Sequence, residues 1–526
     1  MSRRALRVLG CAIALVLVSS GVVPGLTGSS RAQEESPPIT WRPPARVPSP
    51  ENTSSWFPDL AVDAEGNVHV IWCETNHQGY SETGEPVPVT ELERVFHSMW
   101  DGTRWGLAND VVSPHQNIIR NAIAADGHGT VHMVYGADPP YSLYYTQAPG
   151  DAASSAAAWT SPRLVNTRQL TYMSDLAVFQ DTLHVVYDDL GSTIGGRCPR
   201  CADIFYRQSS DGGRTWSAPI DLMETDLGAS RAQMEVDRNG VIHVTWDEGW
   251  DRLSGVGEPQ QSVYVNSVDG GTTWSSPTLV RRPERTAQLS VGSDNKDGVM
   301  LVWRTTTSRY PGIYYMWSTD LGIRWSTPIT IPNVVARGWT DPFDRYDLAT
   351  DSAGNIHLVF GGHIITETQT GTGEAVDSGR HGLYHVIWNG SEWSLPSVIY
   401  EGDWYPAYPN IVIERGNWLH VTWFLRETLW EDRTPHEVWY TRGQLRTPAE
   451  TPIPPSTRTP TPTPEPSATL SPTPTPLPTV APGASGIPNG LFTDADDVLR
   501  LALALSPVAL LIGVAIGIRL GWFRRR

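Results

Sequence analysis

The sequence predicts an all-β protein that folds as a seven-bladed β-propeller. Three observations predict it: a hairpin pattern that recurs seven times, a third strand after each hairpin, and a fourth segment that begins with tryptophan. Repeats of four strands with a period of about 40 residues or more are typical of propellers, whose blades are arranged radially. We therefore expect one ring of seven blades.

The first two strands of each expected blade form a hairpin whose second strand ends in an aromatic residue. Apolar and β-branched residues dominate both strands, and Asp, Asn or Gly mark the turn between them, which favours a half-buried hairpin. The seven hairpins are residues 58–72, 120–135, 174–187, 232–246, 287–303, 346–360 and 409–423.

A third strand follows each hairpin, but a fourth segment follows only six of them. The third strands are residues 94–100, 142–147, 203–208, 262–267, 312–318, 382–388 and 437–442, and the fourth segments open at Trp105, Trp159, Trp216, Trp274, Trp325 and Trp393. Residues 40–50 repeat the Trp-x-x-Pro pattern of residues 273–283. We therefore expect this N-terminal segment to complete the last blade, because closure protects the sheet edges of a ring.

A histidine recurs in the second strand of six blades, at His69, His132, His184, His243, His357 and His420. Blade-equivalent positions are related by rotation about the ring, so these residues are spread apart. We expect hydrogen-bonded core histidines rather than a metal site. The sequence indicates no metal and no cofactor.

Outside the expected propeller at 33–446, the chain carries segments typical of an exported protein. Residues 1–32 predict a signal peptide, with arginines at the start, an apolar run at 11–23 and small residues before the cleavage point. Residues 447–482 contain 13 prolines and 10 threonines, which predicts an extended linker.

The C-terminal end predicts a single-pass membrane anchor. We assign a juxtamembrane segment to 483–497, a transmembrane helix to 498–522 and a cytoplasmic tail to 523–526. Residues 501–518 are 18 uncharged residues followed by arginines, which satisfies the length and charge rules for a span. The propeller is then expected on the extracytoplasmic side of a bacterial cell membrane. A sorting tail that is cleaved after export is the alternative.

The net charge and the cysteines indicate which partners and which covalent links to expect. The net charge of −17 argues against nucleic acid, because phosphate binding needs basic surfaces. Cys198 and Cys201 lie in a Cys-Pro-Arg-Cys loop that the signal peptide places outside the cytoplasm, where disulfides persist, so we expect them to pair. Zinc would need a second ligand pair, which is not evident.

Three turns after third strands share the pattern Ser-x-Asp-x-Gly-x-x-Trp, at 209–216, 267–274 and 318–325. The aspartate is suited to bond backbone N–H groups of the turn, the glycine permits positive φ, and the tryptophan packs below. With these motifs the chain resembles the Asp-box (BNR) repeat β-propellers of the sialidase-like superfamily, over roughly residues 40–442. The resemblance implies a structural role for Asp211, Trp216, Asp269, Trp274, Asp320 and Trp325.

The resemblance also places function on the face opposite the Asp-box turns. Arginines, carboxylates and aromatic residues gather there, a combination that suits a sugar, an acidic sugar or a peptide. The predicted ligand-binding residues are Arg120, Arg231, Arg345, Asp189, Asp247 and Trp404. The alternative is ordinary loop charge, with each arginine paired to an acidic neighbour.

Sialidases of this superfamily use three arginines, a tyrosine nucleophile supported by a glutamate, and an aspartate acid/base. The candidates for these roles are Arg231, Arg285, Arg345, Tyr346, Glu248 and Asp188. Those enzymes are six-bladed, which is the alternative fold, and their early Arg-Ile-Pro motif is absent here. The sequence therefore favours a non-catalytic propeller that binds a glycan or protein ligand. The alternatives are an exo-sialidase-like glycoside hydrolase and an assembly or scaffold factor.

Overall fold

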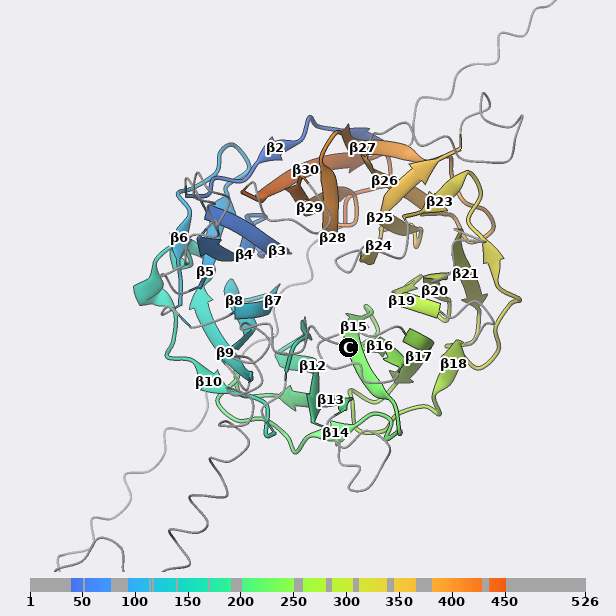
Figure 1. Ribbon diagram of the computed structural model, residues 1–526, viewed down its shortest axis with the longest axis horizontal. Coiled ribbons are helices and arrows are strands. Elements are labelled where there is room, and N and C mark those ends of the chain that lie inside the picture. Colours follow the sequence, from blue (N-terminus) through green and yellow to red (C-terminus); the bar gives the residue numbers. More distant parts are fainter. Residues whose placement is uncertain are drawn as a thin grey trace, which may run out of the picture. The chain divides into compact units, whose positions relative to one another are not determined.

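The computed structural model describes residues 39–50, 53–76, 93–112, 115, 118–138, 141–168, 171–190, 201–249, 259–280, 286–305, 312–337, 345–365, 381–427 and 435–450. Within these residues the strands form seven antiparallel sheets that follow one another around a ring (Figure 1). The seven sheets confirm the predicted all-β, seven-bladed propeller and exclude the six-bladed alternative.

Blades 1 to 5 each contain four strands in chain order. Blade 1 has β3 (Thr53–Val62), β4 (Val68–Asn76), β5 (Arg94–Trp100) and β6 (Asn109–Asp110); blade 2 has β7 (Ile118–Ala125), β8 (Thr130–Ala137), β9 (Ser142–Pro149) and β10 (Arg163–Leu164), with short 3₁₀ helices η1 (Gly150–Ala152) and η2 (Ala156–Ala158). Blade 3 has β11 (Ser174–Phe179), β12 (Thr182–Leu190), β13 (Ala202–Ser209) and β14 (Ile220–Asp221). Blade 4 has β15 (Gly228–Val236), β16 (Ile242–Gly249), β17 (Pro259–Ser267) and β18 (Thr278–Val280); blade 5 has β19 (Thr286–Ser293), β20 (Val299–Thr305), β21 (Ile313–Ser318) and β22 (Ile329–Thr330).

Blades 6 and 7 each contain five strands. Blade 6 has β23 (Val334–Ala336), β24 (Tyr346–Thr350), β25 (Ile356–Ile364), β26 (His381–Trp388) and β27 (Ser397–Gly402); blade 7 has β28 (Tyr405–Glu414), β29 (Trp418–Arg426), β30 (Glu437–Leu445), β1 (Ile39–Trp41) and β2 (Ala45–Arg46). Strands β1 and β2 pair antiparallel with β30, with Ile39 opposite Leu445 and Trp41 opposite Gly443. Blade 7 thus combines an N-terminal and a C-terminal segment.

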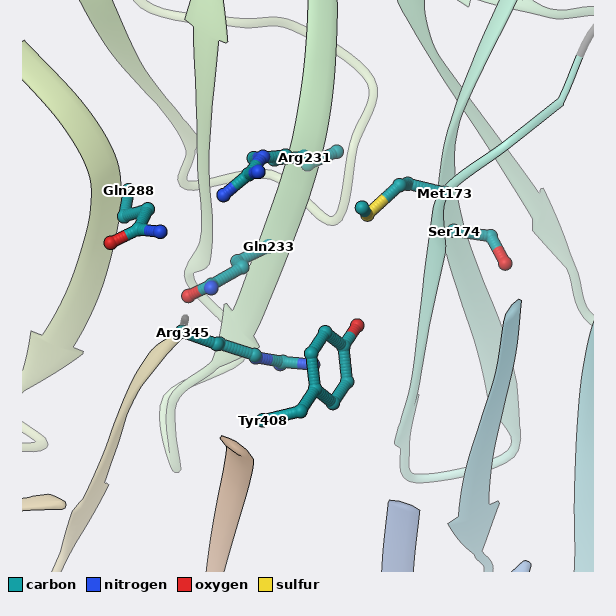
Figure 2. A pocket seen from close by; sticks show the side chains of 8 residues that line it. Met173, Ser174, Arg231, Gln233, Gln288, Arg345 and Tyr408 are labelled. Carbon is teal, nitrogen blue, oxygen red and sulfur yellow. The ribbon is translucent and has the colours of Figure 1, made fainter. Parts of the chain in front are cut away.

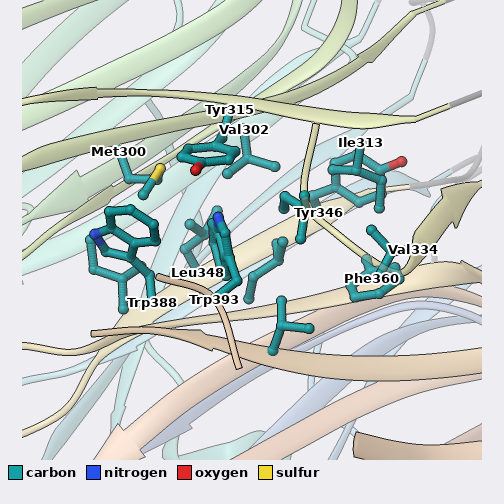
Figure 3. Close-up of a cluster of buried hydrophobic side chains, with 14 of the residues drawn as sticks. Met300, Val302, Ile313, Tyr315, Val334, Tyr346, Leu348, Phe360, Trp388 and Trp393 are labelled. Atoms are coloured by element: carbon teal, nitrogen blue, oxygen red, sulfur yellow. The ribbon is translucent and has the colours of Figure 1, made fainter. Parts of the chain in front are cut away.

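The hydrophobic core lies between neighbouring blades, where two sheets pack face to face. Figure 3 shows the cluster between blades 5 and 6, in which Val302 and Ile313 of blade 5 pack with Leu348 and Phe360 of blade 6. Each fully buried side chain of this size contributes about 1.5–3 kcal/mol to folding.

One aromatic contact recurs at all seven blade interfaces of the described ring. The tryptophan of a blade's outer segment packs against a third-strand tyrosine or histidine of the preceding blade. The pairs are Trp105–Tyr440, Trp159–His97, Trp216–Tyr145, Trp274–Tyr206, Trp325–Tyr264, Trp393–Tyr315 and Trp41–His385, with ring centres 4.9–6.3 Å apart. Trp41 therefore does in blade 7 what the fourth-segment tryptophan does in the other six.

The recurring histidines lie in the core beside these pairs. In blades 2, 3, 4 and 7 the histidine Nδ1 lies 2.7–2.9 Å from the hydroxyl of the paired tyrosine. In blades 1 and 6 it instead meets a second histidine, His97 at 3.0 Å and His385 at 2.9 Å. Burial lowers the pKa of His184 and His243 to about 4, so these rings are neutral at physiological pH. The histidines are structural, because each is bonded within its own blade.

Each Asp-box turn is held by hydrogen bonds between residues of the same turn. Asp269 accepts the N–H of Thr273 at 2.8 Å, and Ser267 Oγ donates to Asp269 while it accepts the N–H of Gly271. These bonds, with Thr273 first, lower the pKa of Asp269 to about 2. Gly271 has a φ of 86°, and a Cβ there would lie 2.1 Å from the Tyr206 hydroxyl of the preceding blade. Asp211 and Asp320 bond in the same way.

The antiparallel order sorts the connections onto two faces. The turns between first and second strands lie at the same end as the Asp-box turns, and we call this end the Asp-box face. The blade-to-blade connections lie at the other end, the mouth face. The seven first strands surround the centre of the ring, and each contacts the next, with β28 against β3 (Figure 1).

Several predicted features lie outside the described residues, namely the signal peptide, the membrane span, the tail and all but residues 447–450 of the linker. None of the helices in the described ranges is long and apolar enough to cross a membrane. Cys73 is a buried free thiol. Cys201 is disulfide-bonded, but Cys198 lies outside the described residues, so their pairing stays a prediction.

Candidate functional site

A pocket opens at the centre of the ring, where the first strands begin on the mouth face. We call it the mouth pocket. It is lined by Met173, Ser174, Arg231, Ala232, Gln233, Gln288, Arg345 and Tyr408 (Figure 2). They come from blades 3, 4, 5, 6 and 7. The pocket therefore exists only in the assembled ring, because no single blade supplies more than a few of its groups.

Three of these residues lie at β-bulges, and each has a left-handed backbone. Arg231, Gln288 and Tyr408 have φ values of 65°, 58° and 53°, and the strand pairing shifts register at each of them. A bulge redirects a side chain that would otherwise follow the regular alternation of the strand. Positive φ at a residue other than glycine costs roughly 1 kcal/mol or more and is concentrated at functional sites. The bulges thus direct these three side chains to the centre of the ring.

Arg345 lies directly before β24, and its guanidinium lies beside the ring of Tyr408, 5.1 Å from the ring centre (Figure 2). Its side chain is 16% exposed, and its nearest carboxylates, Asp175 and Asp347, are 4.0 and 3.9 Å away. These distances are too long for hydrogen bonds. Arg345 Nε has no hydrogen-bond partner among the described residues. Among the described residues, Arg345 therefore has no carboxylate within hydrogen-bond distance.

Arg120 lies next to the mouth pocket on β7. Its guanidinium carbon is 3.3 Å from the ring centre of Phe57 and 5.7 Å from that of Tyr408. Burial and the charge of Arg231 lower the pKa of Arg120 to about 10, which leaves it charged at physiological pH. Three arginines, Arg120, Arg231 and Arg345, thus lie close to one another at the centre of the mouth face.

Below Arg345 a channel continues into the ring, lined by Asp59, Asp175, Glu235 and Asp347. We call Asp59, Asp175 and Asp347 the channel aspartates. Burial raises the pKa of Asp59 to about 7 and that of Asp347 to about 6, although the charge of Arg345 acts in the opposite direction. Burial likewise raises the pKa of Asp175, and that of Glu235 well above its ordinary value.

The carboxylates of the channel were not predicted, and the four carboxylates that were predicted bond to the protein instead of lining the mouth pocket. Asp188 and Asp189 accept backbone N–H groups of the connection before β11, at 2.7–3.3 Å. Asp247 accepts the N–H of Gln288 at 2.8 Å, and Glu248 accepts side-chain N–H groups of Trp246 and Gln261 at 3.1 and 2.6 Å. Asp188 and Asp247 position the backbone of mouth residues rather than touching a ligand.

The remaining predicted site residues lie elsewhere. Tyr346 is fully buried in the hydrophobic cluster between blades 5 and 6, and Trp404 packs at the edge of the cluster between blades 6 and 7. Arg285 lies outside the described residues. Of the predicted set, the structure brings together Arg231 and Arg345, with Arg120 beside them.

The sequence pattern does not single out five mouth residues: Met173, Ser174, Gln233, Gln288 and Tyr408. Each lies within two residues of the first residue of a hairpin repeat. Position in the repeat is therefore the signal that could have identified these residues, because every first strand of a propeller begins near the centre of the ring. Residue type gives none, since isolated Gln, Met and Tyr are common in strands.

No group of histidine, cysteine and acidic side chains that could hold a metal ion occurs among the described residues. The chemistry that the mouth pocket offers is recognition: guanidinium donors for an anion, two amides and a hydroxyl for polar groups, and a tyrosine ring for an apolar surface.

A family model and several solved structures are similar to this chain. Residues 147–421, just over half of the chain, match the family model of the BNR repeat-like domain. Similar solved structures include a protein of unknown function from Dyadobacter fermentans, at 13% identity and a TM-score of 0.46, covering 78% of this chain and 100% of that one. The NanB sialidase of Streptococcus pneumoniae is similar at 13% identity and a TM-score of 0.43, with 77% and 71% covered. A PL25 ulvan lyase is similar at 13% identity and a TM-score of 0.46, with 75% and 95% covered.

No curated protein sequence matches the chain. The family match nevertheless confirms what the three Asp boxes indicate. The chain belongs to the BNR repeat-like domain family.

Proposed function

We propose that the mouth pocket binds the carboxylate of an acidic carbohydrate. The observation that carries this proposal is the pair of arginines in one pocket, Arg231 and Arg345, of which Arg345 has no carboxylate within hydrogen-bond distance among the described residues. A guanidinium binds a carboxylate through two parallel hydrogen bonds, and such charge-assisted bonds are about twice as strong as neutral ones.

The other lining groups suit a sugar. Gln233 and Gln288 offer amides that both donate and accept, Ser174 offers a hydroxyl, and Tyr408 offers a ring face. Sugar hydroxyls need donors and acceptors in fixed positions, and pockets for small molecules combine a few such groups with apolar walls. A simple inorganic anion would leave these amides unused.

A binding screen tests the proposal. The full-length protein is applied to an array of carboxylated, sulfated and neutral glycans, and we expect retention of the carboxylated ones. Arg231→Ala is expected to abolish retention, whereas Arg238→Ala, on the Asp-box face, leaves it unchanged. Equal binding of neutral and acidic glycans, or loss of binding with Arg238→Ala alone, contradicts the proposal.

A second candidate function is hydrolysis of an acidic glycoside, which the placement of Tyr408 favours. Sialidase-like catalysis needs a tyrosine among arginines, and Tyr408, not Tyr346, lies beside Arg345 and Arg120. A fluorogenic sialoside assay distinguishes the two functions. Turnover that Tyr408→Phe removes supports the hydrolase, while binding without turnover supports the binding propeller.

We further propose that the ring is displayed on the extracytoplasmic side of the membrane by the Pro/Thr-rich linker and the C-terminal span. The support is the sequence pattern of residues 1–32, 447–482 and 498–522. Protease added to intact cells is expected to release the ring and to leave a C-terminal tag protected. Digestion of the tag in intact cells contradicts this topology.

A further inference from the structure

Arg345 separates two spaces that differ in charge. Above it lies the mouth pocket, and below it lies the channel with Asp59, Asp175, Asp347 and Glu235. Among the described lining residues of the channel, Arg345 is the only cation. One guanidinium therefore faces an excess of carboxyl groups on one side and the proposed ligand site on the other.

The channel aspartates are fixed in place by the blades. Asp59 accepts the N–H groups of Leu60 and of Ile123 in the next blade, both at 2.9 Å. Asp175 is bonded in the same way across blades 3 and 4, and Asp347 accepts the N–H of Ile411 in blade 7 at 2.8 Å. Because the backbone holds these side chains, they cannot swing away from Arg345. Only proton uptake is able to change their charge.

The contact between Arg345 and these carboxylates is electrostatic rather than hydrogen-bonded. Asp175 and Asp347 lie at 4.0 and 3.9 Å from its terminal nitrogen, and Asp59 and Tyr408 also act on its charge. At this range and burial, the interaction is strong when the carboxyl groups are ionised and disappears when they are neutral. An anionic ligand in the mouth pocket competes with them for the same guanidinium.

We propose that the channel aspartates make binding at the mouth pocket proton-dependent: ionised, they hold the charge of Arg345, and protonated, they release it to an anionic ligand. This inference rests on the proposed function, because it concerns the same site. It predicts that the protein takes up protons when the ligand binds.

The titration range and its sign follow from the surroundings. Asp59 and Asp347 titrate near pH 7 and pH 6 because burial raises the pKa of each, and burial raises the pKa of Asp175 as well. Arg120 and Arg231 stay charged throughout this range. A bound carboxylate adds negative charge beside Arg345, which raises these pKa values further. Affinity therefore increases as the pH falls from about 8 to about 5.5, by up to about tenfold per pH unit for each linked proton.

Titration calorimetry of the full-length protein tests this. The probes are methyl β-D-glucuronide and N-acetylneuraminic acid, with methyl β-D-glucoside as the uncharged control. We expect the Kd of an acidic probe to fall about three- to tenfold per pH unit over this range. Measurements in two buffers of different ionisation enthalpy are expected to show net proton uptake. An acidic probe that binds with the same Kd and no proton uptake throughout overturns the inference and leaves the proposed function standing. Absence of binding at every pH overturns the proposed function, and this inference with it.

The variant Asp347→Asn tests whether the channel aspartates cause the pH dependence of binding. Asp347→Asn removes the charge while keeping the size, so we expect tighter binding near pH 8 and a flatter pH profile. Asp126→Asn is the matched control, since Asp126 is a buried carboxylate in a hairpin turn on the Asp-box face. An unchanged profile in Asp347→Asn, or an equal flattening in Asp126→Asn, contradicts the assignment. Asparagine weakens the bond to Ile411. If Asp347→Asn fails to fold, the net proton uptake of the unaltered protein on binding the acidic probe tests the inference.

Discussion

On the Asp-box face, neighbouring blades meet through residues that repeat from blade to blade. On the mouth face, by contrast, the residues at the start of the first strands differ from blade to blade. The tryptophan that packs on the preceding blade recurs at all seven interfaces, from Trp105 to Trp41. The bulge positions of the first strands instead hold Phe57, Arg231, Gln288 and Tyr408. Repetition therefore marks the residues that close the ring, and departure from repetition marks those at the centre of the mouth face.

This contrast assigns different consequences to substitutions on the two faces. Changes in repeated residues should alter the free energy of unfolding and leave ligand affinity unchanged. Changes at the mouth should alter ligand affinity and leave the free energy of unfolding unchanged.

The largest expected effect is on stability. Trp41→Ala removes the aromatic contact with His385 and the bond from Trp41 Nε1 to Ser397 Oγ, which is 3.2 Å long. A large aromatic-to-alanine change at a packed site costs about 3–5 kcal/mol. Chemical denaturation should show this loss, with a similar loss for Trp105→Ala. A cost below about 1 kcal/mol for Trp41→Ala alone would mean that blade 7 does not need its N-terminal segment.

The next effect is on affinity. Arg231→Ala should weaken binding of a carboxylated glycan about 10- to 100-fold, because a hydrogen bond to a charged group contributes about 1.5–3 kcal/mol. The midpoint of thermal unfolding should stay within a few degrees of that of the unaltered protein. If Arg231→Ala unfolds the ring while Arg238→Ala does not, the mouth arginine is a structural residue and the separation of the two faces fails.

A third substitution tests the Asp-box turn. Gly271→Ala places a Cβ 2.1 Å from the Tyr206 hydroxyl at a φ of 86°, so the turn or the tyrosine must move. We expect a loss of about 1–3 kcal/mol in the free energy of unfolding. Gly270→Ala, at a φ of 68° but with open space around it, should cost less. Equal costs for the two variants would show that backbone conformation alone matters here.

Much of the fold could be predicted from sequence because local chemistry repeats. The hairpins and the Asp boxes depend on neighbours a few residues away, the tryptophans recur at a fixed position in the blade repeat, and the histidine repeat is read correctly as core packing. The mouth could not be predicted in the same way. Asp188 and Glu248 look like free carboxylates in sequence, but Asp188 accepts the N–H of Tyr172 in the connection before β11, and Glu248 accepts an N–H of Gln261 on the neighbouring strand of its own blade. Tyr346 is one residue from Arg345, yet a regular strand directs it into the core, whereas a bulge directs Tyr408 to the centre.

The smallest expected effect is the pH dependence of stability. Asp59 and Asp347 have folded pKa values of about 7 and about 6, above those of an unfolded chain. Their ionisation therefore destabilises the ring at high pH, and the free energy of unfolding should rise as the pH falls from about 8 to about 5.5. Below about pH 4 stability should fall again, because bonds to His132 and to backbone N–H groups lower the pKa of Asp126 to about 2. A flat profile above pH 6 would mean that the channel aspartates do not titrate in this range.

The most direct test of the separation between the two faces is a crystal structure of the ring with a carboxylated sugar bound. We expect the sugar carboxylate within hydrogen-bond distance of Arg345 and Arg231, with the sugar ring against Tyr408 and no ligand on the Asp-box face. A sugar bound instead in the groove beside Trp393 and Leu395, between blades 6 and 7, would contradict the account.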